Sequence, residues 1–80
     1  MKWIEISLKG GRKELINISL VESISIHDDL LTFYFMGMDN KDTLEIQRSE
    51  IKEVAPKTET SVYMDIRRLL EDGEGAVSND

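Results

Sequence analysis

Apolar residues occupy every second position at the start of the chain, from Lys2 to Lys9. This period of two predicts a β-strand with one buried face, formed by Ile4, Ile6 and Leu8. The Gly10–Gly11 pair that follows predicts a tight turn into a second strand, because glycine adopts positive φ values at little cost. The first two strands are therefore expected to form a hairpin.

The alternation continues from Leu15 to Ile26 with one interruption. Leu20 and Val21 are adjacent apolar residues there, which predicts a bulge or a short helical turn between a second and a third strand. The polar sequence from His27 to Asp29 is expected to end the third strand.

The longest apolar run extends from Leu30 to Met38 and contains Phe33, Tyr34 and Phe35. Because aromatic residues favour strands, this run predicts a fourth, central strand. The polar cluster from Asp39 to Asp42 predicts a turn into a fifth, alternating strand. The fourth and fifth strands are thus expected to form a second hairpin.

Two helical segments are predicted after the fifth strand. The three-residue spacing of Ile51 and Val54 favours a short helical turn before Pro56, with Ser49 as its cap. A longer amphipathic helix is expected to begin near Thr60 or Ser61 and to end at Gly73. Its apolar positions are Val62, Tyr63, Ile66, Leu69 and Leu70.

The predicted fold class is α+β. We expect a curved antiparallel sheet or a small, partly open barrel of about five strands, with one C-terminal amphipathic helix. Residues 1–72 form a single domain in this interpretation. Residues 73–80 are expected to be a flexible acidic tail, because they lack the apolar surface that offsets the entropy of ordering.

The order of these elements, with Ile16-Asn17-Ile18 followed by Val21 and Ile24, resembles small bacterial one-domain proteins of the flagellar-operon FlbD type. The resemblance covers roughly residues 2–54. It implies a regulator or interaction module rather than an enzyme, and it assigns no functional residue. The link through Pro56 and the added helix depart from the pattern of that family.

Composition and charge narrow the function classes. Eighty residues without cysteine exclude a disulfide-stapled scaffold and a thiolate zinc site. Four of the 16 acidic residues lie in the last ten positions, so the rest of the chain is nearly balanced by its ten basic residues. Duplex-DNA binding is therefore not expected. The alternating start is unlike a signal peptide, and the longest apolar run is too short for a membrane helix, so we expect a cytoplasmic protein without membrane contact.

No group of residues predicts catalysis, a cofactor or a metal ion. His27 with Asp28 and Asp29 is expected to stabilise a turn, because a metal site gathers about three or four ligands. The acidic loop from Asp39 to Glu45 lacks the glycine of a calcium loop. The segment from Gly10 to Lys13 could hold a phosphate only weakly, since a strand rather than a helix follows it. We therefore expect a protein that is not an enzyme.

Uncovered apolar surface is the strongest functional signal, because one helix cannot cover a whole sheet. Trp3 should point away from the helix, together with either Tyr34 and Met36 or Phe33 and Phe35. The predicted interaction face consists of Trp3, Tyr34, Met36 and Met38. We expect it to mediate homodimerisation or binding of another protein, unless a tightly curled barrel buries these residues inside.

A second hypothesis is a small β-barrel that binds single-stranded nucleic acid. Bases would stack on Trp3, Tyr34 or Phe33, and nearby cations would contact the phosphates. The candidate cations are Arg12, Lys13, Arg48 and Lys52. The nearly neutral body of the chain disfavours this hypothesis.

Overall fold

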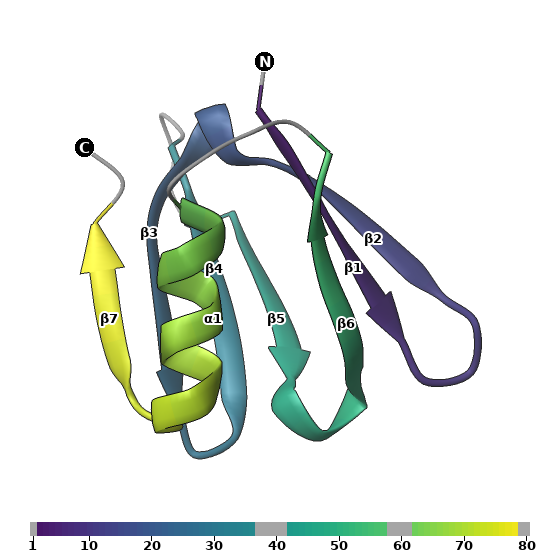
Figure 1. Cartoon of the computed structure of the whole chain (residues 1–80). Coiled ribbons are helices and arrows are strands. Elements are labelled where there is room, and N and C mark those ends of the chain that lie inside the picture. The colour runs from purple at the N-terminus through teal and green to yellow at the C-terminus, as the bar shows by residue number, and fades with distance from the viewer. Residues whose placement is uncertain (1, 37–41, 58–61, 79–80) are drawn as a thin grey trace.

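The structure, a computed structural model, describes residues 2–36, 42–57 and 62–78. Over these ranges the chain forms strands β1 (Trp3–Leu8), β2 (Lys13–Asn17), β3 (Val21–His27), β4 (Leu30–Phe35), β5 (Thr43–Gln47), β6 (Ile51–Pro56) and β7 (Gly75–Ser78). The helical elements are two single 3₁₀ turns, η1 (Ile18–Leu20) and η2 (Arg48–Glu50), and one α-helix, α1 (Val62–Asp72) (Figure 1).

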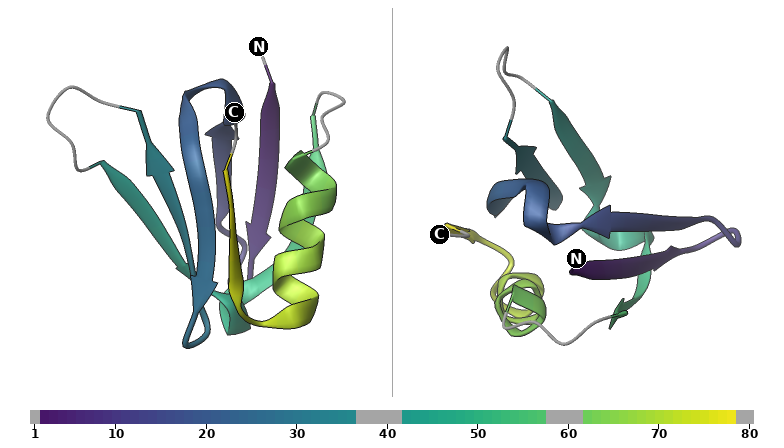
Figure 2. Two further views of the ribbon diagram at one scale, coloured as in Figure 1. Left: turned by 90° about the vertical axis from the view of Figure 1, so that its left-hand side faces the viewer. Right: turned by 90° about the horizontal axis from the view of Figure 1, so that it is seen from above.

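The strands form two antiparallel sheets, and the chain passes from one sheet to the other at its 3₁₀ turns. One sheet has three strands in the order β2-β1-β6, and the other has four in the order β5-β4-β3-β7. The turn η1 connects β2 to β3, and η2 connects β5 to β6, so each turn leads from one sheet into the other. Helix α1 lies on the inner side, near β3, β6 and β7 (Figure 1, Figure 2).

These elements confirm the α+β class and correct the expected number of strands. Seven strands in two sheets replace a single sheet or barrel of about five. The turn η1 is the short helical turn expected near Leu20, and the Oδ1 of Asn17 caps it by accepting the N–H of Ser19 (3.0 Å). The fifth strand continues through η2 into an unexpected sixth, and the chain end adds a seventh.

The prediction of a helical turn at Ile51 and Val54 is wrong, because both residues belong to strand β6. Glu53 pairs with Ser7 and Ile51 pairs with Leu8, so Lys52 is an extra residue in the ladder. Such a bulge lets two side chains three positions apart face the same side of the sheet. The spacing that resembled a helix is thus the spacing of a bulged strand.

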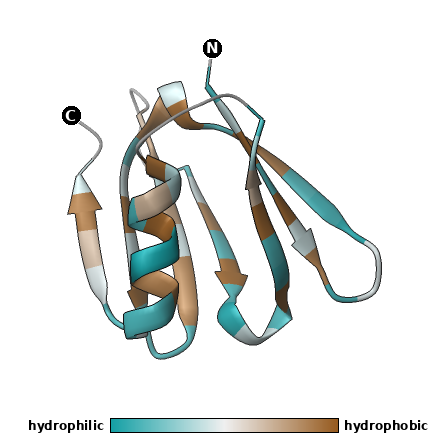
Figure 3. Ribbon diagram, viewed as in Figure 1, coloured by the Kyte–Doolittle hydropathy of each residue, from teal (hydrophilic) through white to brown (hydrophobic). Residues whose placement is uncertain are grey.

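The core lies between the two sheets and α1. Phe33 is completely buried and Phe35 packs against the core, so Tyr34 and Met36 are the outward pair of the two possible sets. In Figure 3, brown apolar segments alternate with teal hydrophilic ones along the strands and the helix. The buried residues are Ile4, Ile6, Leu8, Ile16, Ile18, Val21, Ile24, Ile26, Leu31, Phe33, Ile46, Val54, Val62, Ile66 and Leu69.

Strand β7 (Gly75–Ser78) occupies part of the segment where we expected a flexible tail. Helix α1 ends as predicted at Gly73, which has a φ of 79° and whose N–H donates to the C=O of Leu69 (2.8 Å). Strand β7 then pairs with β3, with Val77 opposite Ile24 and packed against the core. The backbone hydrogen bonds of β3 and the burial of Val77 offset the ordering entropy that the local sequence alone could not.

Candidate interaction surfaces

The outer face of the four-stranded sheet is almost free of charge. The register places the outward residues in adjacent rows: Ala76 and Ser78; Ser23, Ser25 and His27; Leu30, Thr32 and Tyr34; Thr43, Glu45 and Gln47. Thr32 lies at the centre, between Ser25 and Glu45, and is only 7% exposed. The carboxylates of Glu22, in the bulge of β3, and Glu45, on an edge strand, lie at the margins of this face.

Three residues with exposed apolar side chains lie at one end of that face. Tyr34 is 42% exposed and Met36 is 54% exposed. The N–H of Met36 donates to the C=O of Leu20 (2.8 Å), and Leu20 is 52% exposed. We call Leu20, Tyr34 and Met36 the apolar end of the outer face. Leu20 was not among the predicted interaction residues. A signal for it was present, because adjacent residues point in different directions, and burial of Val21 therefore leaves Leu20 exposed.

Trp3, another predicted interaction residue, does not lie with this group. Trp3 lies on β1 in the three-stranded sheet, half-buried, with its C=O accepting the N–H of Lys57 (2.8 Å). Met38 lies outside the described residues. The structure therefore brings together Tyr34 and Met36, adds Leu20, and leaves Trp3 on the second sheet.

The outer face of the three-stranded sheet is charged. Glu5 lies on it between two lysines, with its Oε1 3.9 Å from the Nζ of Lys13 and 3.6 Å from the Nζ of Lys57. Leu15, the register partner of Glu5, is exposed beside them. Because interface centres are poor in charged residues, this face suits association less well than the outer face of the four-stranded sheet.

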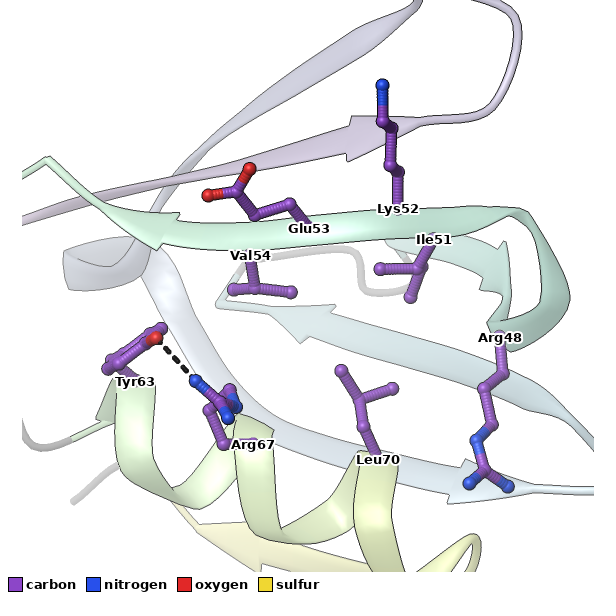
Figure 4. A pocket seen from close by; sticks show the side chains of 8 residues that line it. All are labelled: Arg48, Ile51, Lys52, Glu53, Val54, Tyr63, Arg67 and Leu70. Carbon is purple, nitrogen blue, oxygen red and sulfur yellow. Dashed lines mark hydrogen bonds between the residues drawn. The ribbon is translucent and has the colours of Figure 1, made fainter.

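A groove of about 430 Å³ separates β6 from α1. Ile51 and Val54 of β6 and Leu70 of α1 point into it (Figure 4). Arg48 of η2 lies at one end of the groove, and the pair of Tyr63 and Arg67 lies at the other. We call it the β6–α1 groove. Its floor is apolar and its ends are cationic.

Arg67, on helix α1, is held in position by Tyr63, four residues earlier on the same helix. The Nη1 of Arg67 donates to the hydroxyl of Tyr63 (2.8 Å), and the guanidinium lies 5.7 Å from the centre of the Tyr63 ring. This hydrogen bond is the main reason why the pKa of Arg67 is raised above its usual value. Electrostatic attraction between the guanidinium and Tyr63, and to a smaller extent Glu71, acts in the same direction. Arg67 is thus a permanent, oriented cation at the mouth of the groove.

Arg48, the arginine at the other end of the groove, lies beside the C-terminal end of α1. A Cβ placed on Gly73 would lie 2.9 Å from the Nη1 of Arg48, so the guanidinium sits beside the C-terminal turn of the helix. A cation is favourable there, because the helix dipole is negative at this end. Neither Arg48 nor Arg67 forms an ion pair with any carboxylate that the structure describes.

The Gly10–Gly11 turn forms the predicted hairpin, and β2 follows it. The hollow beside it contains four cations: Lys9, Arg12, Lys13 and Lys52. Two of them already have partners, since Arg12 pairs with Glu14 (3.2 Å) and Lys13 with Glu5. This hollow joins three of the cations proposed for nucleic-acid binding, whereas Arg48 lies in the β6–α1 groove. Phe33 cannot stack on a base, because it is completely buried.

His27, the last residue of β3, lies close to two carboxylates. Its Nε2 lies 3.2 Å from Asp28, and its Nδ1 lies 3.4 Å from Glu74, the residue before β7. These contacts lie between the turn and the residue that precedes β7, and the turn-stabilising role of His27 stays a prediction. Over residues 2–36, 42–57 and 62–78 no group of three potential metal ligands occurs.

The single α-helix of the described chain has 11 residues. Within the described ranges, no helix has both the length and the apolar character needed to cross a membrane. No protein-family model matches the chain, and no curated protein or solved structure matches it.

Proposed function

We propose that the chain is a cytoplasmic, non-enzymatic interaction or regulatory module that forms a homodimer through the outer face of its four-stranded sheet. The observation that carries this proposal is the apolar end of that face, next to rows of residues that are mostly small and uncharged. Tyrosine and methionine are favoured at the centres of interfaces, and charged residues are disfavoured there. A role of this kind is also what the resemblance to FlbD-type proteins implies, and that resemblance stays a prediction.

A second copy is the partner that we favour for this face. A nearly uncharged surface does not repel a second copy of itself, and two copies related by a twofold axis can bury it in one isologous contact. A domain of 80 residues buries a smaller share of its surface on folding than a larger domain does, so burying more by association adds useful stability.

The proposal predicts the effect of removing the apolar end. The double variant Tyr34→Ser/Met36→Ser should dissociate the dimer, with a dissociation constant raised by about 30-fold or more, because aromatic hot spots contribute about 2 kcal/mol or more. Light scattering after size exclusion over a hundredfold concentration range measures this change. Leu15→Ser, on the charged face of the other sheet, is the matched control and should leave the mass unchanged.

A monomeric wild-type protein over the whole range would contradict the proposal. So would a double variant that keeps the circular dichroism spectrum and the mass of the wild type. Unfolding of the double variant would show that Tyr34 and Met36 support the fold rather than an interface.

Binding of single-stranded nucleic acid is the second candidate function. The four cations around the Gly10–Gly11 turn favour it, since they form one basic hollow. Trp3 lies at the opposite end of β1 from this turn, so a titration with an end-labelled, mixed-sequence oligonucleotide at low salt is followed by the fluorescence anisotropy of the label. No change up to high micromolar concentration would remove this candidate.

A further inference from the structure

We propose that the β6–α1 groove binds an extended acidic segment of a partner protein, which adds as a strand to the open edge of β6. The proposed ligand has an apolar residue with carboxylates two positions before and after it. This surface is distinct from the outer face of the four-stranded sheet, so the inference does not depend on the proposed dimer.

The edge of β6 is open to an added strand. In the described chain β6 has one neighbour, β1. The N–H of Lys57 donates to the C=O of Trp3, and in an antiparallel ladder every second residue points its backbone groups to the partner. The backbone N–H and C=O of Val54 therefore point to the open edge. An extended peptide bound there gains main-chain hydrogen bonds of the kind used in β-augmentation.

The floor of the groove accepts one apolar side chain. Val54 is buried, and Ile51 and Leu70 are partly buried against the core. These three side chains face one another across the groove, between its two cationic ends (Figure 4). The volume of about 430 Å³ lies in the range of clefts that bind small ligands or side chains. A valine or leucine in the ligand would cover this floor.

The charges at the ends select for carboxylates. Arg48 and Arg67 are the cations at the two ends, and guanidinium groups bind carboxylates through paired, charge-assisted hydrogen bonds. The only carboxylate among the lining residues is that of Glu53, and Figure 4 shows it on the opposite side of β6. A groove with cations at both ends is notable in a chain with a net charge of −6, and it complements an acidic ligand.

The spacing of the ligand follows from strand geometry. Alternate residues of a strand point to the same side, and they lie about 7 Å apart. An apolar residue on the floor therefore has its second neighbours on the same side, facing the two ends of the groove. The probe that fits this arrangement is a fluorescein-labelled peptide with the sequence Thr-Glu-Thr-Val-Thr-Glu-Thr and blocked ends.

The test measures fluorescence anisotropy of this probe with the full chain at low salt. We expect binding that Arg67→Gln weakens about tenfold and that replacing both glutamates of the probe by glutamine weakens at least as much. Arg48→Gln should act in the same direction. Arg68→Gln, which changes an exposed arginine one position further along α1, is the matched control and should bind as the wild type does. Tyr34→Ser/Met36→Ser should also bind the probe, whether or not it dimerises.

Amide hydrogen exchange distinguishes strand addition from attraction of charges alone. The N–H of Val54 should exchange at least tenfold more slowly when the probe is bound, whereas amides at the edge of β5 should not change. Absence of binding at about 1 mM probe, equal binding of the glutamine peptide or an unchanged affinity of Arg67→Gln would each overturn the proposal. It would also be overturned if an oligothymidylate of ten nucleotides displaced the probe, because the groove would then be a site for nucleic acid.

Discussion

Asp28 and Asp29 form the turn between β3 and β4 in a backbone conformation that few residues adopt. Their φ values are 51° and 66°, in the left-handed region. Two successive residues of this kind make the two-residue turn whose twist matches that of a hairpin. Aspartate tolerates the conformation better than most residues, because its short side chain can bond to nearby backbone groups. The polar interruption after the third strand is thus a conformational requirement.

Substitution of Asp29 tests this requirement. Asp29→Gly should raise the free energy of unfolding by up to about 1 kcal/mol, since glycine adopts positive φ without steric cost. Asp29→Val should lower it by about 1–2 kcal/mol, because a β-branched side chain clashes in this region. Urea unfolding followed by circular dichroism measures both changes. If both variants shifted the free energy in the same direction, the turn would not have the geometry described here.

At the scale of elements, β7 is the strand whose existence depends most on its partner. It has four residues and only Val77 packs against the core, while Ala76 lies on the opposite face of the sheet. Its order comes from pairing with the edge of β3, with Ser23 opposite Ser78 and Ile26 opposite Gly75. The strand therefore covers an edge that would otherwise be open to other chains.

Substitution by serine should change the free energy of unfolding more on the inner face of β7 than on its outer face. Val77→Ser should lower the free energy of unfolding by about 1–2 kcal/mol, because it replaces an apolar side chain that packs against the core with a polar hydroxyl group. Ala76→Ser is the matched control and should change it by less than about 0.5 kcal/mol. Equal, negligible effects in urea unfolding would indicate a loose tail, as the local sequence had suggested.

Elements with local signals were predictable from the sequence. The alternation of Ile4 and Ile6 and the helical spacing of Val62 and Ile66 predicted β1 and α1, because burial of one face imposes each period. The bulge at Lys52 was misleading, since it gives a strand the three-residue spacing of a helix. Strand β7 was missed because its partner β3 lies about fifty residues away in the sequence.

The candidate surfaces depend still more on distant contacts. Alternation on β4 left two outward pairs possible, and the burial of Phe33 in the structure selects Tyr34 and Met36. The proximity of Leu20 to Met36 results from a backbone bond between η1 and the end of β4. The groove joins Arg48 to Arg67 across 18 intervening positions of the chain. No local pattern in the sequence brings these pairs together.

At the scale of the whole molecule, the two sheets present outer faces of different character. Glu5 with Lys13 and Lys57 keeps one face hydrated, whereas Thr32 and its small neighbours make the other face nearly uncharged. Dimerisation through the uncharged face would leave the charged face and the β6–α1 groove accessible. The protein would then be a symmetric pair with two outward grooves, suited to binding two segments of one partner with increased avidity.

The dimer also has a thermodynamic signature. Because association stabilises only the folded chain, the unfolding midpoint of the wild type should rise with protein concentration. The midpoint of Tyr34→Ser/Met36→Ser should not depend on concentration. Calorimetric scans over the concentration range used for light scattering measure this difference, and equal slopes for the two proteins would argue against the dimer.

Strands β6 and β7 both pair with strands that precede them by about fifty residues, as Ile4 does with Pro56 and Ser23 with Ser78. Each pairing closes a long loop, and the entropy of closure is lost before the contacts form. A chain that is still being synthesised has β1 and β3 but lacks the strands that cover their edges. Strand β6 is available once residue 56 has been added and β7 only once residue 78 has been added, so the edge of β3 stays exposed to misassembly longer than that of β1.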